Sequence, residues 1–283
     1  MVDKSISSTG ALPVTILEPG RHEAAYWRDL WRYRELFYFL AWRDILVRYK
    51  QTAFGITWAL LQPLLTMAVF TVVFGRLAKL PSDGAPYPIF VFAALLPWQF
   101  FAAAVTNGAN SLVSNANLVS KVYFPRLIVP SAAIIPGLVD FAISLGFLSV
   151  LMAWFGSWPD WRVATLPLFL LLGAATALGA AYWLAALTVK YRDFRYVVPF
   201  LLQAGLFISP VGFSSAIVPE SFRTLYSINP LVGVIDGFRW ALLGGTTPLN
   251  SVGLALSAVL AATLLASGIR YFRSTEKTFA DVI

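Results

Sequence analysis

The sequence has no cysteine, and its one histidine, His22, stands in the polar N-terminal part of the chain. Without cysteine the chain cannot form a disulfide, a thiolate metal site or a cysteine nucleophile. One histidine is too few for a histidine metal cluster or a catalytic triad within one chain. We therefore expect neither a catalytic residue nor a metal site here, and most hydrolase chemistry is excluded.

Charge is also scarce. Only 12% of the 283 residues are charged, 58% are hydrophobic, and the mean hydropathy is +0.72. A soluble domain carries about 25% charged residues, so this composition indicates a protein that crosses the membrane several times. The net charge of +7 would suggest a nucleic-acid partner for a soluble protein. Lys and Arg beside membrane spans give the same excess, so we expect no nucleic-acid partner.

Residues 1–21 contain no apolar stretch as long as the core of a signal peptide. They are rich in Ser, Thr, Pro and Gly, and we expect a disordered cytoplasmic tail. The first true span must then insert the protein into the membrane.

Charged residues mark the limits of six apolar runs in residues 51–283, the expected membrane-spanning domain. A hydrocarbon core of about 30 Å is crossed by roughly 20 apolar residues in a helix. We therefore expect an all-α protein with six transmembrane helices, within Gln51–Gly75, Tyr87–Val113, Leu127–Pro159, Val163–Val189, Tyr196–Pro210 and Ser251–Ile269.

The basic residues predict the orientation of these spans. With the N-terminus inside, the inner segments hold sixteen of the 21 Lys and Arg residues, and the outer segments hold five. This bias favours a cytoplasmic location for both termini.

Residues 22–50 precede the first span and form an expected amphipathic helix. Trp27 and Trp31 share one face of the helical wheel with other apolar residues, whereas Arg28 and Arg32 lie on the opposite face. Such a helix should lie in the membrane interface. The alternative is a soluble amphipathic helix packed on a partner.

Two further segments are too short or too interrupted to span. The stretch NANLVSKVYFPRLIVP (Asn115–Pro130) falls on the cytoplasmic side between the second and third spans. The segment of about 210–250 is apolar but broken by Pro and Gly, and it contains Asp236 and Arg239 at the spacing of a helical pair. We expect two short outward-side helices there that dip back into the membrane.

The sequence contains, in this order, the blocks RYKQTAFGITWALLQPLL, LLPWQFF, NANLVSKVYFPRLIVP, KYRDFRYVVPFLLQAGLFISPVGF, NPLVGVIDGFR and EKTFADVI. Together these blocks resemble the ABC-type polysaccharide export permeases, the membrane subunits that move lipid-linked O-antigen, capsule or teichoic acid. The resemblance runs from about Leu36 to the C-terminus.

The resemblance implies a half-transporter that pairs with a second copy of itself, with two ATPase subunits docked beneath. No G-x-x-x-x-G-K-[ST] motif occurs in the sequence, so this chain cannot cradle nucleotide phosphates in that manner. ATP and magnesium would therefore be bound by the partner subunit, and this chain would need no cofactor of its own.

The resemblance also assigns a coupling helix to residues 115–126. The residues expected to meet the ATPase are Asn117, Leu118, Val119, Lys121, Val122 and Tyr123. Leu118, Val119 and Val122 would form an apolar stripe, Lys121 would be exposed, and Pro125 would end the helix. A plain loop between spans is the alternative.

The family's outward-side gate helices correspond to the segment of about 210–250, with Asn229, Pro230, Asp236 and Arg239 as its candidate residues. Asp140 is the only carboxylate inside an expected span. A mid-span aspartate costs about 2.5–3.5 kcal/mol on insertion scales, so it should face the bundle interior and find a donor. We favour a structural hydrogen bond over an ion relay, because no second membrane carboxylate completes a relay.

Aromatic residues make up 15% of the chain. Aromatic rings offer a sugar-tolerant surface, much as they stack nucleic-acid bases without sequence preference. The channel-lining candidates are Trp58, Trp98, Phe100, Phe101, Tyr182 and Trp183. For each of them, contact with lipid or ordinary packing is the alternative.

We therefore expect a homodimeric permease subunit, itself no enzyme, in the bacterial inner membrane. Its ATP-driven complex would export lipid-linked polysaccharide, with O-antigen as the leading substrate. A lipid or drug permease of the same superfamily is the nearest alternative. A membrane glycosyltransferase or acyltransferase, or an ion-driven carrier, would need more histidines, clustered carboxylates or intramembrane charges.

Overall fold

The computed structural model describes residues 23–50, 55–244 and 249–279. These ranges are helical and contain no β-strand. The tail 1–21 and His22 lie outside the described residues. The α-helices are α1 (Glu23–Arg32), α2 (Arg34–Lys50), α3 (Gly55–Phe70), α4 (Tyr87–Ser114), α5 (Ala116–Lys121), α6 (Ile128–Ala132), α7 (Ile135–Trp154), α8 (Leu166–Lys190), α9 (Phe194–Ile208), α10 (Glu220–Tyr226), α11 (Pro230–Leu242) and α12 (Ser251–Thr275).

Short helical segments of other kinds extend three of these helices. A π-helical segment, Thr71–Leu77, continues α3, and 3-10 turns lie at Trp161–Thr165 before α8 and at Glu276–Thr278 after α12. A further 3-10 turn, Ser215–Ile217, precedes α10.

Five helical stretches in the described residues are long and apolar enough to cross a membrane. They coincide with five of the six expected spans. The stretches are Ala59–Leu77, Tyr87–Ser114, Ile128–Trp154, Trp161–Lys190 and Ser251–Thr278.

The expected fifth span differs from the other five. It corresponds to α9, which is apolar but only 15 residues long, and 15 helical residues rise about 22 Å. The third expected span is broken into α6 and α7, and the chain turns at Ala133 and Ile134 between them.

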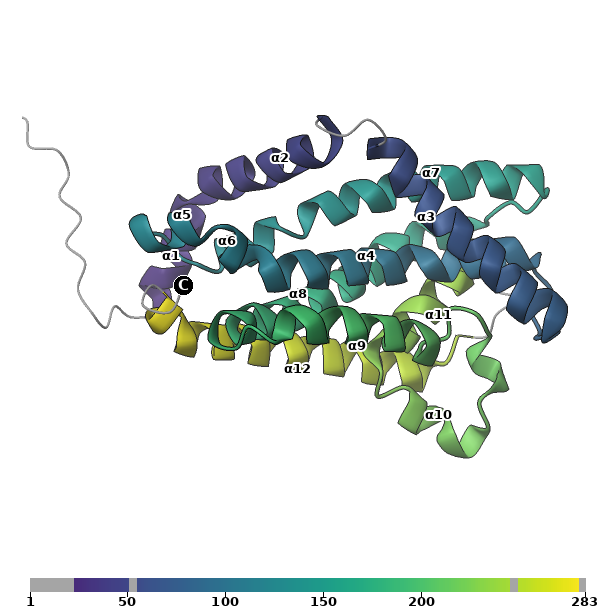
Figure 1. Cartoon of the computed structure of the whole chain (residues 1–283). Helices are drawn as coiled ribbons and strands as arrows, with labels where there is room; N and C mark the ends of the chain where they lie inside the picture. Colours follow the sequence, from purple (N-terminus) through teal and green to yellow (C-terminus); the bar gives the residue numbers. More distant parts are fainter. Residues whose placement is uncertain (1–22, 51–54, 245–248, 280–283) are drawn as a thin grey trace, which may run out of the picture.

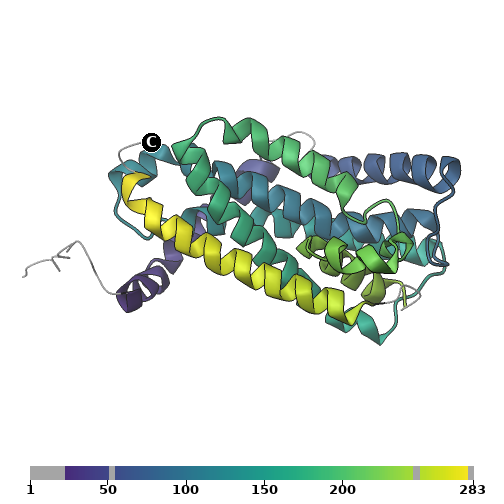
Figure 2. The ribbon, with the colours of Figure 1, turned by 90° about the horizontal axis from the view of Figure 1, so that it is seen from below.

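Helix α4 lies at the centre of the bundle. It packs against α7 and α8, while α12 runs along the other side of α8 (Figures 1 and 2). The half of α4 from Ile89 to Trp98 is buried throughout. Because α4 is enclosed by protein, its apolar side chains form the main core, whereas α3 and α9 bury few of their apolar side chains.

Two glycines allow α8 and α12 to cross in direct contact. A Cβ at Gly179 would lie 2.7 Å from the backbone of Leu264, and one at Gly268 would lie 2.5 Å from the carbonyl oxygen of Gly179. Small residues let apolar helices approach closely enough for backbone packing in lipid. This crossing is therefore closed to any larger side chain at either position.

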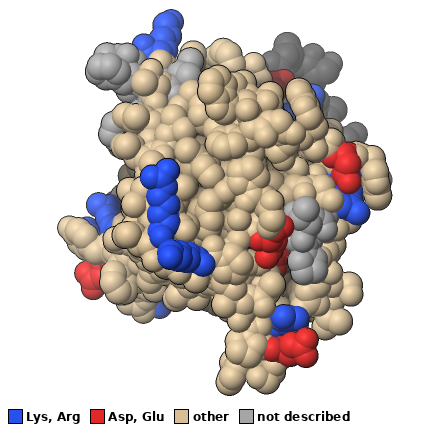
Figure 3. All heavy atoms as spheres, turned by 90° about the vertical axis from the view of Figure 1, so that its right-hand side faces the viewer, with Lys and Arg blue, Asp and Glu red and all other residues tan. Residues whose placement is uncertain are grey.

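The two ends of the bundle differ. We call the end that carries α1, α5 and the last turn of α12 the α5 end, and the end that carries α10 and α11 the α11 end (Figure 1). Seen in Figure 3, the α11 end is mostly uncharged surface with isolated acidic and basic side chains.

A second apolar cluster lies at the α5 end, separate from the core around α4. We call it the α5-end cluster. Its buried members are Leu40, Ala41, Leu112, Val119, Phe124, Leu127, Ile128, Val129, Ala132, Tyr182, Ala185, Ala186, Val189, Phe272 and Phe279.

The expected amphipathic helix of residues 22–50 is two helices, α1 and α2, joined at Tyr33. Leu40 and Ala41 are buried in the α5-end cluster. Trp27, Trp31, Arg28 and Arg32 are all exposed, so the tryptophans do not pack on the described bundle. The described residues thus leave this aromatic face of α1 uncovered.

Candidate functional site

A polar groove opens on the side of the bundle between α3, α4, α7 and α9. It encloses a cavity of about 440 Å³. Its polar lining is unusual for helices this apolar, because unpaired polar groups are costly in lipid. The polar side chains are those of Arg48, Gln62, Thr66, Gln99, Thr106, Asn107, Asp140 and Ser144.

Two of the six aromatic candidates border this groove. Trp98 and Phe100 line it from α4, while Phe101 lines a neighbouring cavity of about 230 Å³ together with Trp98. Trp98 and Leu202 therefore line both cavities. The predicted lining residues included these rings but not Gln62, Gln99 or Asn107, which stand out as polar exceptions in apolar helices.

Two other aromatic candidates pack helices together instead. The Tyr182 hydroxyl lies 2.7 Å from Ser131 Oγ, and its ring contacts Phe272 edge-on. Trp183 stacks on Tyr271 with ring centres 4.0 Å apart and donates from Nε1 to Ser267 Oγ at 3.2 Å. The side chain of Trp58, in α3, lies outside the described residues.

Asp140 sits at one edge of the groove, and its side chain is 17% exposed. Its partners come from α2, where Arg48 forms an ion pair with the carboxylate and the Tyr49 hydroxyl donates to it. The expected donors therefore exist, but they lie on the helix before the first span. Asp140 consequently joins α7 to the end of α2.

The α5 end carries the expected coupling segment. Helix α5 covers Ala116–Lys121, so it ends four residues before Pro125, and Val122 already has extended backbone. The expected stripe is correspondingly divided, because Val119 is buried and Leu118 half-buried, while Val122 is 50% exposed. The exposed coupling candidates are Asn117, Lys121, Val122 and Tyr123.

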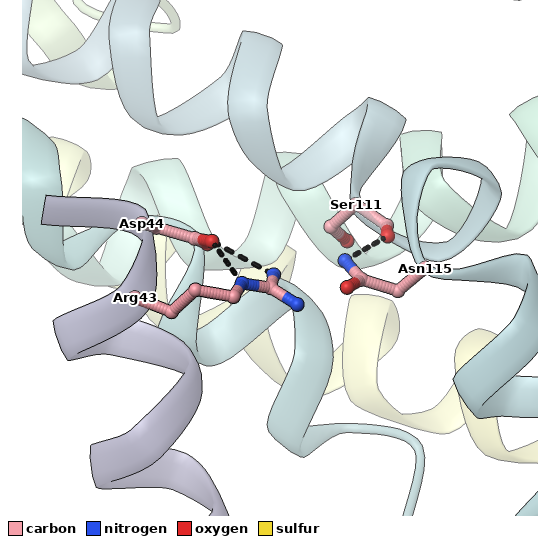
Figure 4. Close-up of polar contacts among 4 residues, drawn as sticks. All are labelled: Arg43, Asp44, Ser111 and Asn115. Atoms are coloured by element: carbon pink, nitrogen blue, oxygen red, sulfur yellow. Dashed lines mark hydrogen bonds and ion pairs between the residues drawn. The ribbon is translucent and has the colours of Figure 1, made fainter. Parts of the chain in front are cut away.

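The junction between α4 and α5 is closed by a local hydrogen bond. Asn115 Nδ2 donates to the main-chain oxygen of Ser111 at 2.8 Å, and Figure 4 shows this contact. The same figure shows Arg43 of α2 paired with Asp44 through Nη2 at 2.7 Å. The Asn115 side chain thus holds the corner between α4 and α5.

The α11 end is organised around a buried arginine. Arg239 is 1% exposed and donates to the carbonyl oxygens of Val211 and Phe213, each at 2.9 Å, and of Phe90 at 3.3 Å. The expected helical spacing with Asp236 is present in α11, but these hydrogen bonds go to main-chain groups. Arg239 therefore binds the loop that follows α9 and, through the Phe90 carbonyl, helix α4.

Further contacts hold the same loop after α9. The Tyr87 hydroxyl donates to the Gly212 carbonyl oxygen at 2.5 Å, and Ser214 Oγ donates to Asp83 Oδ2 at 2.6 Å. Asn229 caps α11 by accepting from the Leu231 N–H at 3.1 Å, and its Nδ2 donates to Ser209 Oγ at 2.9 Å. Pro230 occupies the first turn of α11, where its missing N–H costs nothing.

Asp236 borders a second polar cavity, of about 350 Å³, between α10, α11 and the start of α12. Burial is the largest influence on this carboxyl and raises its pKa to about 6, while a hydrogen bond with Ser215 and the charge of Arg239 act in the opposite direction. Tyr226, which lines the same cavity, has its pKa raised by burial and then by Asp236.

Within residues 23–50, 55–244 and 249–279 there is no cluster of three His, Cys, Asp or Glu side chains that could hold a metal ion. The described polar side chains instead form a groove along apolar helices and fixed contacts at the bundle ends. This arrangement is that of a multi-pass membrane protein with polar side chains in a lateral groove and at both ends of the bundle.

The ABC-2 type transporter family matches residues 35–243, and the chain belongs to this family. The match begins within α2 and runs through all of the groove helices to the end of α11.

Individual relatives extend the similarity over most of the chain. An O-antigen export system permease protein, RfbA, from Myxococcus xanthus is 32% identical over 258 residues, covering 90% of this chain and 98% of the relative. An RfbA of Klebsiella pneumoniae is 25% identical, covering 85% and 92%. The polysialic acid transport protein KpsM of Escherichia coli is 22% identical, covering 83% and 91%. These names all describe transport proteins or permeases.

Proposed function

We propose that this chain is the permease subunit of an ATP-driven ABC transporter that exports lipid-linked polysaccharide, O-antigen in the first place, across the bacterial inner membrane. The observation that carries the proposal is the polar groove, whose glutamine, asparagine and threonine side chains suit sugar hydroxyls. The names of the RfbA and KpsM relatives agree with such a substrate.

The working unit is a homodimer in this proposal. Helices α3 and α9 border the groove and expose apolar side chains such as Leu65, Val69, Phe200 and Phe207. A second copy packed on these faces would close the groove into a channel and cover the exposed side chains. The gain comes from packing and lipid release, because lipid is as apolar as the helices.

We take α9, the expected fifth span, to cross the membrane as well, with the buried loop after it completing the crossing, so that the protein has six transmembrane helices. Carbonyl groups at membrane depth need donors, and Arg239 and Tyr87 supply them to residues 211–213. Helices α10 and α11 are then the outward-side gate helices, re-entering the membrane without spanning it.

The α5 end faces the cytoplasm in this proposal, as the distribution of Lys and Arg favours. Both termini lie on that side. Helices α1 and α2 lie in the interface, where the exposed Trp27 and Trp31 would contact lipid and Arg28 and Arg32 would meet water or head groups.

The ATPase is a separate polypeptide, two copies of which dock on the α5 ends of the dimer. Asn117, Lys121, Val122 and Tyr123 form the exposed docking surface in this proposal. ATP and magnesium are bound by that partner. Closure of the ATPase pair would push on α5 and shift α3, α4 and α9, so the groove would open by mechanical force.

A lipid or drug permease of the same family is the nearest competing function. Such a substrate would need no continuous polar path, so substitutions that make the groove apolar would leave its transport intact. If the protein were instead a membrane glycosyltransferase or acyltransferase, substitution of its catalytic residues would abolish the transfer of a sugar or acyl group.

The test is deletion of the gene followed by localisation of the lipid-linked glycan. We expect accumulation on the cytoplasmic leaflet and loss of surface polymer, with both defects reversed by the intact gene. Normal surface polymer in a deletion strain that has no second exporter would contradict the proposal. Absence of the glycan from both leaflets would point to a biosynthetic enzyme.

A further inference from the structure

The last described residues of the chain are tied to segments far away in sequence. Tyr26 of α1 donates from its hydroxyl to Glu276 Oε2 at 3.0 Å, and the Arg126 guanidinium donates to the Glu276 carbonyl oxygen. The guanidinium of Arg273 lies over the Tyr26 ring, 4.5 Å from its centre. Glu276, the first residue after α12, therefore accepts hydrogen bonds from α1 and from the connection between α5 and α6.

Apolar packing fixes the same segment. Phe279 is 2% exposed, and its ring contacts Phe272 with centres 5.2 Å apart. Both belong to the α5-end cluster, which also contains Val119 of α5 and Phe124 and Leu127 of the connection to α6. The C-terminal segment Glu276–Phe279 and the coupling segment thus share one apolar cluster and one polar contact.

Helix α5 needs such support. It has six residues, and an isolated helix of that length is unstable in water because nucleation is not repaid by enough hydrogen bonds. Only Val119 of this helix is fully buried. The position of α5 must therefore be set by what holds its two flanks: the Asn115 corner on one side, and Phe124, Arg126 and Leu127 on the other.

We propose that Glu276–Phe279 is a positioning clamp for the coupling segment, joining it to α1 and to the end of α12. The clamp would hold α5 in the orientation that meets the ATPase and would pass its displacement to the last span and to the N-terminal helices. This inference rests on the proposed function, because it assigns α5 to ATPase docking. Arg126, Tyr26 and Phe279 are positioning residues in it, since they act through α5.

The chain's lack of cysteine allows a direct test. A spin label on Ser120→Cys, at an exposed position of α5, would report the mobility of this helix in the complete complex with its ATPase. We expect Arg126→Gln and Phe279→Ala to increase label mobility and Tyr26→Phe to do so less. Thr278→Val is the matched control, because Thr278 bonds only locally, to the Thr275 carbonyl oxygen at 2.8 Å. Equal mobility in all variants would overturn the clamp.

Transport gives the second readout, in proteoliposomes with the ATPase present. We expect ATP hydrolysis in Arg126→Gln to stay near the parent rate while polymer exported per ATP falls about tenfold, the effect of losing one charge-assisted hydrogen bond. Arg126→Lys, which keeps a positively charged donor, should recover part of the loss. A purely structural contact would instead lower the amount of complex and leave export per ATP unchanged, and that result would overturn the clamp.

The two hypotheses fail separately. If Lys121→Glu leaves both ATPase binding and export per ATP unchanged, α5 is not the docking helix and the proposed function is wrong at that point. Label mobility on Ser120 still tests the clamp in that case. If instead Lys121→Glu weakens binding and the clamp variants change neither mobility nor export per ATP, only the clamp is refuted.

Discussion

The guanidinium carbon of Arg239 lies 3.6 Å from the centre of the Phe90 ring, inside the α11 end of the bundle. Phe90 belongs to α4, whereas the carbonyls of Val211 and Phe213 that accept from Arg239 belong to the loop after α9. One buried side chain of α11 therefore joins three separate parts of the fold. A charge in this position is tolerated because it donates to carbonyl oxygens and lies against an aromatic face.

Replacing Arg239 by Lys should destabilise this end. Lysine keeps the charge but cannot present the planar fork of donors that reaches several carbonyls. We expect a loss of about 2–3 kcal/mol, or roughly 5–10 °C in the unfolding midpoint of the purified protein in detergent. Arg223→Lys is the control, because Arg223 also donates to two carbonyls but is partly exposed. Equal midpoints for the two variants would refute the role of burial.

Replacing Asp236 by Asn should stabilise the protein in a pH-dependent manner. Because burial raises the pKa of Asp236 to about 6 from the 3.8 of an unperturbed carboxyl, the unfolded chain ionises first as pH rises. Ionised Asp236 then costs stability, increasingly from pH 4 to pH 6 and fully above pH 6. We expect a gain of up to about 3 kcal/mol for Asp236→Asn at pH 7.5.

The gain from Asp236→Asn should vanish toward pH 4, where the aspartic acid is neutral in both states. Unfolding midpoints measured at pH 4.5 and pH 7.5 check this dependence. Glu220→Gln is the control, since the Glu220 side chain is 90% exposed. A gain of the same size at both pH values would contradict the predicted ionisation.

Asp140 should act through structure. Asp140→Asn retains an acceptor for Tyr49 and should keep assembly and export, whereas Asp140→Leu should lower both, because it leaves Arg48 and Tyr49 without this partner. Arg48 is 40% exposed, so the ion pair itself contributes about 1 kcal/mol or less. Membrane levels, dimer content and exported polymer measure the effect. Abolished export by a fully assembled Asp140→Asn protein would instead indicate an ion relay.

The polar groove should be sensitive to loss of its amides. Gln99→Leu, and separately Gln62→Leu, should lower polysaccharide export on the order of tenfold per lost sugar hydrogen bond, with protein levels unchanged. Gln203→Leu makes the same change at an exposed position of α9 outside the groove lining. Export that is unaffected by both groove variants would favour a lipid or drug substrate.

Charge reversal at the coupling segment should separate ATP hydrolysis from transport. Lys121 is exposed beside Val122, at the end of α5, so Lys121→Glu should weaken ATPase docking or uncouple it without unfolding the dimer. A bulky polar residue at Val122 should do the same. ATPase pull-down and export per ATP measure this, with Lys79→Glu, an exposed lysine outside α5, as control. Full coupling in Lys121→Glu would contradict the assignment.

The long spans were predictable because charges interrupt apolar runs at their ends. The second span, expected at Tyr87–Val113, is α4 at Tyr87–Ser114. The last, expected at Ser251–Ile269, is α12 and continues to Thr275, because a helix does not stop where hydrophobicity stops. The break between α6 and α7 was not predicted, because both helices are apolar and hydropathy does not show where a helix turns.

The candidate sites were predictable only in part. That Asp140 would find a donor followed from the cost of a bare carboxylate, but the donor on Tyr49 lies 91 residues away. Tyr182 and Trp183 looked like Trp98 in sequence, yet they pack α8 against α6 and α12, because the direction in which a helix faces its neighbours depends on crossing angles.

The sequence by itself determined the class of the protein. Its apolar runs require helices in lipid, and its ordered blocks indicate the transporter family. The tertiary structure decided which charges are buried and which segments meet. From the sequence, Arg239 is placed in an outer segment, but the fold buries it. Tyr26 and Glu276 are 250 residues apart in the sequence, and the folded bundle brings them into contact. Local composition governs partition between water and lipid, whereas contacts between distant residues arise only when helices pack.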